Sequence, residues 1–295
     1  MRQSVLFRYL DPEVLSRISG HSLEPRGLVM GNLAGAHKSP FHGFAVEFAG
    51  HREYVWGDDP KHIDWRVYFT RGKYFVKQYE METNLVCHLV LDVSASMRYG
   101  DGAEQKLLYA AKMAAALGHA VVRQSDKVSF ATFDDAVRGF VSPSHSMAQM
   151  VRITEHLDAT KPVEKTRMPE CLVDLCGRMR RREIVMIFSD FLCDLKALEP
   201  ALQRLRFSQH EVVLFQVLHH EEISFDFSGQ VKFVGLESAD SFQTSPDDLR
   251  AGYLQALQAF LVELTETAQR NRVEHVLVNT RRDLAEVLGD YLSGR

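Results

Sequence analysis

Short apolar runs alternate with longer helical patterns over the last two thirds of the chain. The runs at residues 85–91, 127–133, 184–188, 211–218 and 273–278 resemble strands that are buried on both faces. Apolar residues recur at helical spacing at residues 104–124, 146–158, 168–180, 195–207, 247–270 and 281–292. Strands alternating with helices of this length predict a doubly wound, mostly parallel α/β sheet with helices on both faces. Residues 137–141 are an expected edge strand, and residues 231–234 an expected short extended segment.

The first part of the chain has a different pattern. Residues 20–80 are rich in Gly, Pro, His and aromatic residues, and short alternating segments at 44–48 and 74–79 predict strands joined by turns. A short helix is expected within residues 5–19, where Asp11 and Pro12 match an N-cap followed by Pro at the first helical position. We therefore expect a smaller β-rich N-terminal region with a short leading helix at residues 1–83, and an α/β domain at residues 84–295.

Composition narrows the class of protein. The 295 residues carry a formal net charge of -4, which gives no overall electrostatic attraction to nucleic acid. There is no apolar stretch long enough for a membrane span and no signal-peptide pattern, so the cytoplasm is the expected compartment. The four cysteines form no C-x-x-C pair. The sequence also lacks the P-loop, the G-x-S-x-G elbow and the G-x-G-x-x-G turn, which argues against the corresponding enzyme classes.

The candidate chemistry stands at the carboxyl ends of two predicted strands, where ligands bind in folds of this type. Asp92, Ser94 and Ser96 alternate directly after the first strand, and Asp190 follows the strand at 184–188. Alternating residues of an extended segment point the same way. One carboxylate, two hydroxyls and a second carboxylate, acting directly or through water, are hard oxygen ligands that suit Mg²⁺ or Mn²⁺.

This D-x-S-x-S pattern, with a later Thr and a later Asp at a strand end, resembles the metal-ion-dependent adhesion site of von Willebrand factor A-type domains. The resemblance implies Asp92, Ser94, Ser96, Thr166 and Asp190 as ligands of a magnesium or manganese ion. Thr160 is the second candidate for the Thr ligand. Thr166 departs from the pattern because it lacks the usual neighbouring Gly.

A second resemblance lies upstream. The segments at 52–66, REYVWGDDPKHIDWR, and 73–80, KYFVKQYE, are similar to the signature of the bacterial domain-of-unknown-function-58 family. With the metal-site motif, the resemblance covers about residues 20–220. It implies a MoxR-type AAA+ ATPase as a partner. Many members have membrane segments, and this chain is expected to have none.

Two polar clusters have alternative interpretations. Asp58, Asp64 and Arg66, with Asp59, form either a recognition surface beside the ion or, as the favoured interpretation, a structural polar network. Residues 219–222, His-His-Glu-Glu, are interpreted as a solvated loop in preference to a second metal site.

The function expected from these patterns is a metal-dependent protein–protein binding or adaptor module, without enzymatic activity. Its ion would accept an Asp or Glu carboxylate from the partner protein. One alternative is a Mg²⁺-dependent phosphohydrolase with an aspartate nucleophile, but the acid/base residue such enzymes need two positions on is here Ser94. The other alternative is a structural scaffold in which the ion site is idle.

Overall fold

The computed structural model describes residues 2–26, 46–58, 60–81, 85–160, 166–234 and 241–295. The chain forms two compact units, one comprising Val29–Asn84 and the other Met1–Leu28 together with Leu85–Arg295. The second and larger unit contains all of the predicted metal ligands, so its architecture positions the candidate site.

The larger unit is built on one six-stranded sheet. Its strands are β3 (Val86–Asp92), β4 (Lys127–Phe133), β5 (Val137–Ser144), β6 (Ile184–Ser189), β7 (Glu211–Leu218) and β10 (Glu274–Asn279). They lie in the order β10-β7-β6-β3-β4-β5, and neighbours are parallel except for β4 and β5, which are antiparallel. The predicted doubly wound, mostly parallel α/β sheet is confirmed, and so is the edge strand at β5.

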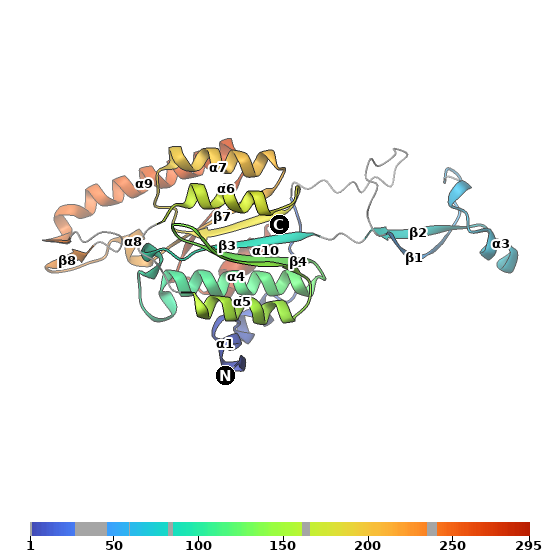
Figure 1. The fold of residues 1–295 in the computed structure, drawn as a ribbon, viewed down its shortest axis with the longest axis horizontal. Coiled ribbons are helices and arrows are strands. Elements are labelled where there is room, and N and C mark those ends of the chain that lie inside the picture. The colour runs from blue at the N-terminus through green and yellow to red at the C-terminus, as the bar shows by residue number, and fades with distance from the viewer. Residues whose placement is uncertain (1, 27–45, 59, 82–84, 161–165, 235–240) are drawn as a thin grey trace. The chain divides into compact units, whose positions relative to one another are not determined.

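Helices cover both faces of this sheet (Figure 1). One face packs against α4 (Lys106–Arg123), α5 (Ala148–Ala159) and α10 (Leu284–Ser293), and the other against α6 (Met168–Arg178), α7 (Leu195–Phe207) and α9 (Pro246–Arg270). The pleat of β3 explains how one strand serves both layers. Leu89 and Leu91 enter the first core, whereas Val90 between them enters the second.

The leading segment packs on this larger unit, which differs from the division expected on sequence. It forms two helices, α1 (Arg2–Tyr9) and α2 (Pro12–Arg17), and the side chain of Asp11 caps α2 as predicted, accepting the amide of Glu13 at 2.9 Å. Leu10 and Ile18 are buried in the core that contains α4 and α10. Burial of these apolar side chains against α4 and α10 removes them from water, which explains why the leading helices pack on the larger unit.

The smaller unit is a two-stranded antiparallel ribbon with a short helix. β1 (Val46–Glu53) pairs with β2 (Phe75–Met81), and α3 (Trp65–Arg71) lies between them in sequence. The sequence pattern did not predict α3. It is set by Asp64, whose carboxylate accepts the amide of Arg66 at 3.0 Å, and by Gly72, which ends the helix in the left-handed region at φ 67°.

The polar residues of the smaller unit pair with one another. Arg52 donates to Asp58 at 2.8 Å, and Asp64 is bonded to His51 at 2.9 Å while it also caps α3. Within this unit, Asp58 and Asp64 thus each pair with a neighbouring residue. The favoured interpretation, a structural network that ties the N-terminal region to the sheet, stays a prediction. Asp59 lies outside the described residues.

The segment between β7 and α9 contains a short helix, α8 (His220–Ser224), and a small ribbon of β8 (Val231–Val234) with β9 (Ser241–Thr244). The expected extended segment at 231–234 is confirmed as β8. None of the helices in the described part of the chain is both long enough and apolar enough to cross a membrane.

Candidate functional site

The sheet topology brings the two predicted carboxylates to one edge. β3 and β6 are adjacent and parallel, with Leu91 opposite Phe188. Asp92 ends β3 and Asp190 directly follows β6, so both stand at the carboxyl ends of central strands. Both are almost fully buried, at 1% and 3% exposure. β3 and β6 are thus neighbouring central strands of the sheet.

The carboxylate of Asp92 is held by two donors. Its Oδ1 accepts the amide of Ser94 at 2.9 Å, and its Oδ2 accepts the hydroxyl of Ser189 at 2.7 Å. Burial, followed by the charge of Asp190, raises the pKa of Asp92 from 3.8 to about 7, and the hydrogen bonds from Ser189 and Ser94 offset only part of this increase. Asp92 is therefore a carboxylate whose negative charge is poorly compensated by the protein, and a cation would compensate it.

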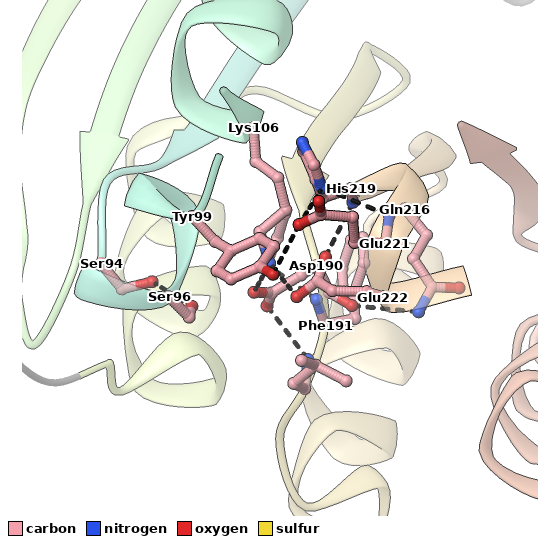
Figure 2. Close-up of polar contacts among 12 residues, drawn as sticks. Ser94, Ser96, Tyr99, Lys106, Asp190, Phe191, Gln216, His219, Glu221 and Glu222 are labelled. Atoms are coloured by element: carbon pink, nitrogen blue, oxygen red, sulfur yellow. Dashed lines mark hydrogen bonds and ion pairs between the residues drawn. The ribbon is translucent and has the colours of Figure 1, made fainter. Parts of the chain in front are cut away.

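The two serines of the motif gather beside Asp92. Ser94 is fully buried and precedes the 3₁₀ turn Ala95–Arg98, which contains Ser96. The hydroxyl oxygens of Ser94 and Ser96 lie 3.1 Å apart and share a hydrogen bond (Figure 2). The hydroxyl oxygens of both serines are thus brought together as expected, but by a 3₁₀ turn and not by the extended segment assumed from the alternating pattern.

Thr166 lies at the same edge of the sheet. The amide of the next residue, Arg167, donates to the backbone oxygen of Asp134 at 2.8 Å. Asp134 itself directly follows Phe133, the register partner of Asp92. The hydroxyl oxygen of Thr166 is buried and has no hydrogen-bond partner among the described residues. A buried hydroxyl left without a partner is costly, so this atom is a candidate ligand.

The alternative ligand Thr160 is already used by its own helix. It caps the end of α5, and its hydroxyl donates to the backbone oxygen of His156 at 2.8 Å. Of the two candidates, Thr166 therefore fits the site better, in spite of the missing Gly.

Asp190 is engaged by a residue that the sequence pattern did not single out. Its Oδ2 accepts the ammonium of Lys106 at 2.9 Å (Figure 2). Its Oδ1 accepts the amide of Leu192 at 3.2 Å. The turn after it is strained, because Phe191 has φ 57° without being glycine. With both oxygens engaged, Asp190 would contribute to an ion through water or by exchanging its lysine partner.

Lys106 extends the network to α8. Its Nζ also lies 2.8 Å from Oε1 of Glu222, and the other carboxylate oxygen of Glu222 accepts the amide of His219 at 2.7 Å. The side chain of His219 also accepts the amide of Glu221 (Figure 2), and His219 and Glu222 together form a capping box that begins α8. Burial alone would lower the pKa of Lys106, but the charges of Asp190 and Glu222 raise it overall.

The interpretation of residues 219–222 as a solvated loop is therefore wrong. These residues cap and begin a helix, and His219 is 7% exposed. A five-residue helix is too short to produce a periodic pattern. The sequence does contain a signal for the burial of Lys106. The residues three, four and seven positions after it lie on the buried face of α4, so the helical spacing places Lys106 on the same face.

The residues present fit a divalent ion that relies on hydroxyl ligands. Asp92, Ser94, Ser96 and Thr166 offer oxygen atoms, and Asp190 is close enough for its charge to raise the pKa of Asp92. Within the described ranges, no three His, Cys, Asp or Glu side chains are grouped so that they could hold a metal by themselves. A metal ion bound here would therefore depend on Ser and Thr oxygens, which suit Mg²⁺ or Mn²⁺ better than softer ions.

Comparison with known proteins places the chain among relatives. The family described as "Protein of unknown function DUF58" matches residues 50–260. Two similar proteins are the uncharacterized proteins Rv1480 of Mycobacterium tuberculosis and Mb1516 of Mycobacterium bovis. Each is 24% identical over 292 residues, covering 94% of this chain and 89% of the relative.

Solved structures with some similarity include BatB from Bacteroides thetaiotaomicron. It is 14% identical, covers 71% of this chain and 98% of its own, and gives a TM-score of 0.44. The SpRpn10 VWA domain is 10% identical, with 70% and 95% of the two chains covered and a TM-score of 0.40.

Proposed function

The chain belongs to the DUF58 family of proteins of unknown function, and we propose that it is a metal-dependent protein-binding module. The ion is Mg²⁺ or Mn²⁺, held by Asp92, Ser94, Ser96 and Thr166, and Asp190 contributes through water or by exchanging its lysine partner. Its role is to bind a carboxylate, from Asp or Glu, of a partner protein. By the family resemblance, the partner is a MoxR-type AAA+ ATPase.

One observation supports this proposal above the others. A poorly compensated buried carboxylate, Asp92, stands with the paired hydroxyls of Ser94 and Ser96 at an edge of the sheet where the hydroxyl of Thr166 has no partner among the described residues. A divalent cation satisfies all of these groups at once. It would retain positive charge with so few acidic ligands, and a carboxylate from outside would complete its coordination.

The enzymatic alternative has less support. An aspartate nucleophile needs a nearby acid/base group, and the residue two positions after Asp92 is Ser94, whose hydroxyl is bonded to Ser96. We therefore propose binding in preference to catalysis. The scaffold alternative makes a distinct prediction, since an idle site gives no change in melting temperature on addition of Mg²⁺ or Mn²⁺.

The test is binding of the purified MoxR-type ATPase from the same organism, measured by calorimetry in MgCl₂ and in EDTA. Wild type should bind in MgCl₂ only, and Asp92→Ala should not bind in either. Asp174→Ala is the matched control, because Asp174 is exposed and pairs with Arg178 one helical turn away. Binding that survives both EDTA and Asp92→Ala would refute the proposal.

A second measurement separates the ion from the partner. Thermal unfolding with and without MgCl₂ should show a metal-dependent rise for wild type and none for Asp92→Ala, about 2.7 kcal/mol at 100 times the dissociation constant. If this rise occurs but the ATPase does not bind, the ion site stands and the identity of the partner is wrong.

A further inference from the structure

Lys106 is a charged residue in an apolar setting. It begins α4, whose following turns are almost wholly buried, and its own side chain is among the largest fully buried ones in the described part of the chain. Removing an ammonium from water costs several kcal/mol unless it is paired and hydrogen-bonded. A lysine at this position therefore requires partners that compensate its charge.

The partners of Lys106 are two carboxylates from different parts of the fold. Asp190, after β6, lies 2.9 Å from Nζ, and Glu222, on α8, lies 2.8 Å from it. Glu222 cannot turn away freely, because its second oxygen accepts the amide of His219. The ammonium is thus fixed between the predicted ion ligand Asp190 and a carboxylate that belongs to another element (Figure 2).

This arrangement changes the charge available to an ion. Asp92 and Asp190 together would offer a divalent cation two negative charges. The positive charge of Lys106 neutralises the negative charge of Asp190, so that Asp92 is the ligand whose charge stays uncompensated. A bound ion then keeps net positive charge, and its affinity for the protein alone is reduced.

We propose that Lys106 is a specificity-determining residue of the ion site, a fixed internal cation that neutralises Asp190 and so keeps the bound ion weakly held and electropositive. This inference rests on the proposed function, because it concerns the same ion. It explains why an ion here would favour a partner that brings a carboxylate. Glu222 has the opposite role, since it draws the charge of Lys106 away from Asp190.

The test uses Mn²⁺ alone and compares a charge-balanced double variant with a single variant. Lys106→Met by itself would leave two neighbouring buried carboxylates, so the main variant is Lys106→Met with Glu222→Gln. The second variant, Glu222→Gln alone, retains the Lys106–Asp190 pair and the shape of the site. Dissociation constants come from the paramagnetic resonance signal of free Mn²⁺, after unfolding in EDTA has verified that each variant is folded.

The proposal predicts shifts in opposite directions. Glu222→Gln should bind Mn²⁺ several-fold more weakly than wild type, and the double variant about tenfold or more tightly than Glu222→Gln. A merely structural role for Lys106 would weaken binding in both variants. If the double variant does not fold, the proposal depends on Glu222→Gln, and unchanged or tighter binding there would overturn it. A folded double variant that binds no more tightly than Glu222→Gln would do the same.

The variant Asp92→Ala separates the two proposals. If Asp92→Ala abolishes Mn²⁺ binding in wild type and the double variant shows no gain, the ion site stands and only the role of Lys106 is refuted. If Asp92→Ala binds Mn²⁺ as well as wild type does, or if neither wild type nor any variant binds Mn²⁺, the proposed function fails and the inference on Lys106 fails with it.

Discussion

Replacing Asp92 with Asn tests whether the buried carboxylate stores unfavourable free energy that a cation would relieve. Burial and the charge of Asp190 raise its pKa from 3.8 to about 7. At 1.36 kcal/mol per pKa unit, this difference corresponds to about 4 kcal/mol. The folded protein holds the proton of the Asp92 carboxyl more tightly than the unfolded chain does. The stabilisation that this proton gives to the folded state is therefore fully present below pH 3.8 and is lost as the pH rises through 7.

Asn has nearly the same shape as Asp but no charge. Its carboxamide offers one acceptor oxygen to the two donors, Ser94 and Ser189, so about 1 kcal/mol should be lost from a hydrogen bond. We therefore expect Asp92→Asn to raise the free energy of unfolding by about 2–3 kcal/mol at pH 8 in EDTA. At pH 4, where Asp92 of wild type is protonated in the folded state, this gain should disappear.

The assay is urea unfolding of wild type and Asp92→Asn at pH 4 and pH 8, with EDTA. Asp174→Asn is the control, because its exposed ion pair with Arg178 should contribute no more than about 0.5 kcal/mol at either pH. A variant less stable than wild type at pH 8 would refute the reasoning, as would a gain that is the same at both pH values. Addition of MgCl₂ should then stabilise wild type and leave Asp92→Asn unchanged.

Two further predictions concern the ion. Asp92 must lose its proton to bind a cation, and its pKa is raised to about 7. The affinity for Mn²⁺ should therefore fall about tenfold for each pH unit below 7 and level off above pH 8. Calorimetry at pH 5.5, 6.5 and 8 measures this affinity, and a profile that does not change with pH would contradict the prediction. Thr166→Val should weaken Mn²⁺ binding about tenfold or more while leaving the metal-free protein as stable as wild type, because the hydroxyl it removes has no partner among the described residues. The matched change Thr160→Val removes a hydroxyl that is hydrogen-bonded to the backbone oxygen of His156, and it should not alter Mn²⁺ binding. A larger effect at Thr160 than at Thr166 would show that Thr166 is not the Thr ligand.

The sequence predicts the parts of the site that follow from strand periodicity. Asp92 and Asp190 are found because each ends an apolar run, and parallel strands end at one edge of a sheet. Lys106 and Glu222 are missed as site residues because their contact joins residues 116 positions apart, and such pairing appears only in three dimensions. The helix α3 is missed because its aromatic residues also suit strands, whereas the N-cap at Asp64 and the left-handed Gly72 favour a helix.

The outer edge of the sheet at β5 limits how a partner can bind. Between its pairs with Val128 and Phe130, β5 contains one extra residue, and Pro143 lies in this bulge without an amide to donate. The buried side chain of Gln149 donates to the backbone oxygens of Val128 and Ser142, so it occupies acceptors beside the irregularity. An incoming peptide would find an interrupted ladder there and could not extend the sheet by β-augmentation at that point. Recognition by this protein at the β5 side would thus depend on side chains and loops, which also protects the sheet from edge-to-edge aggregation.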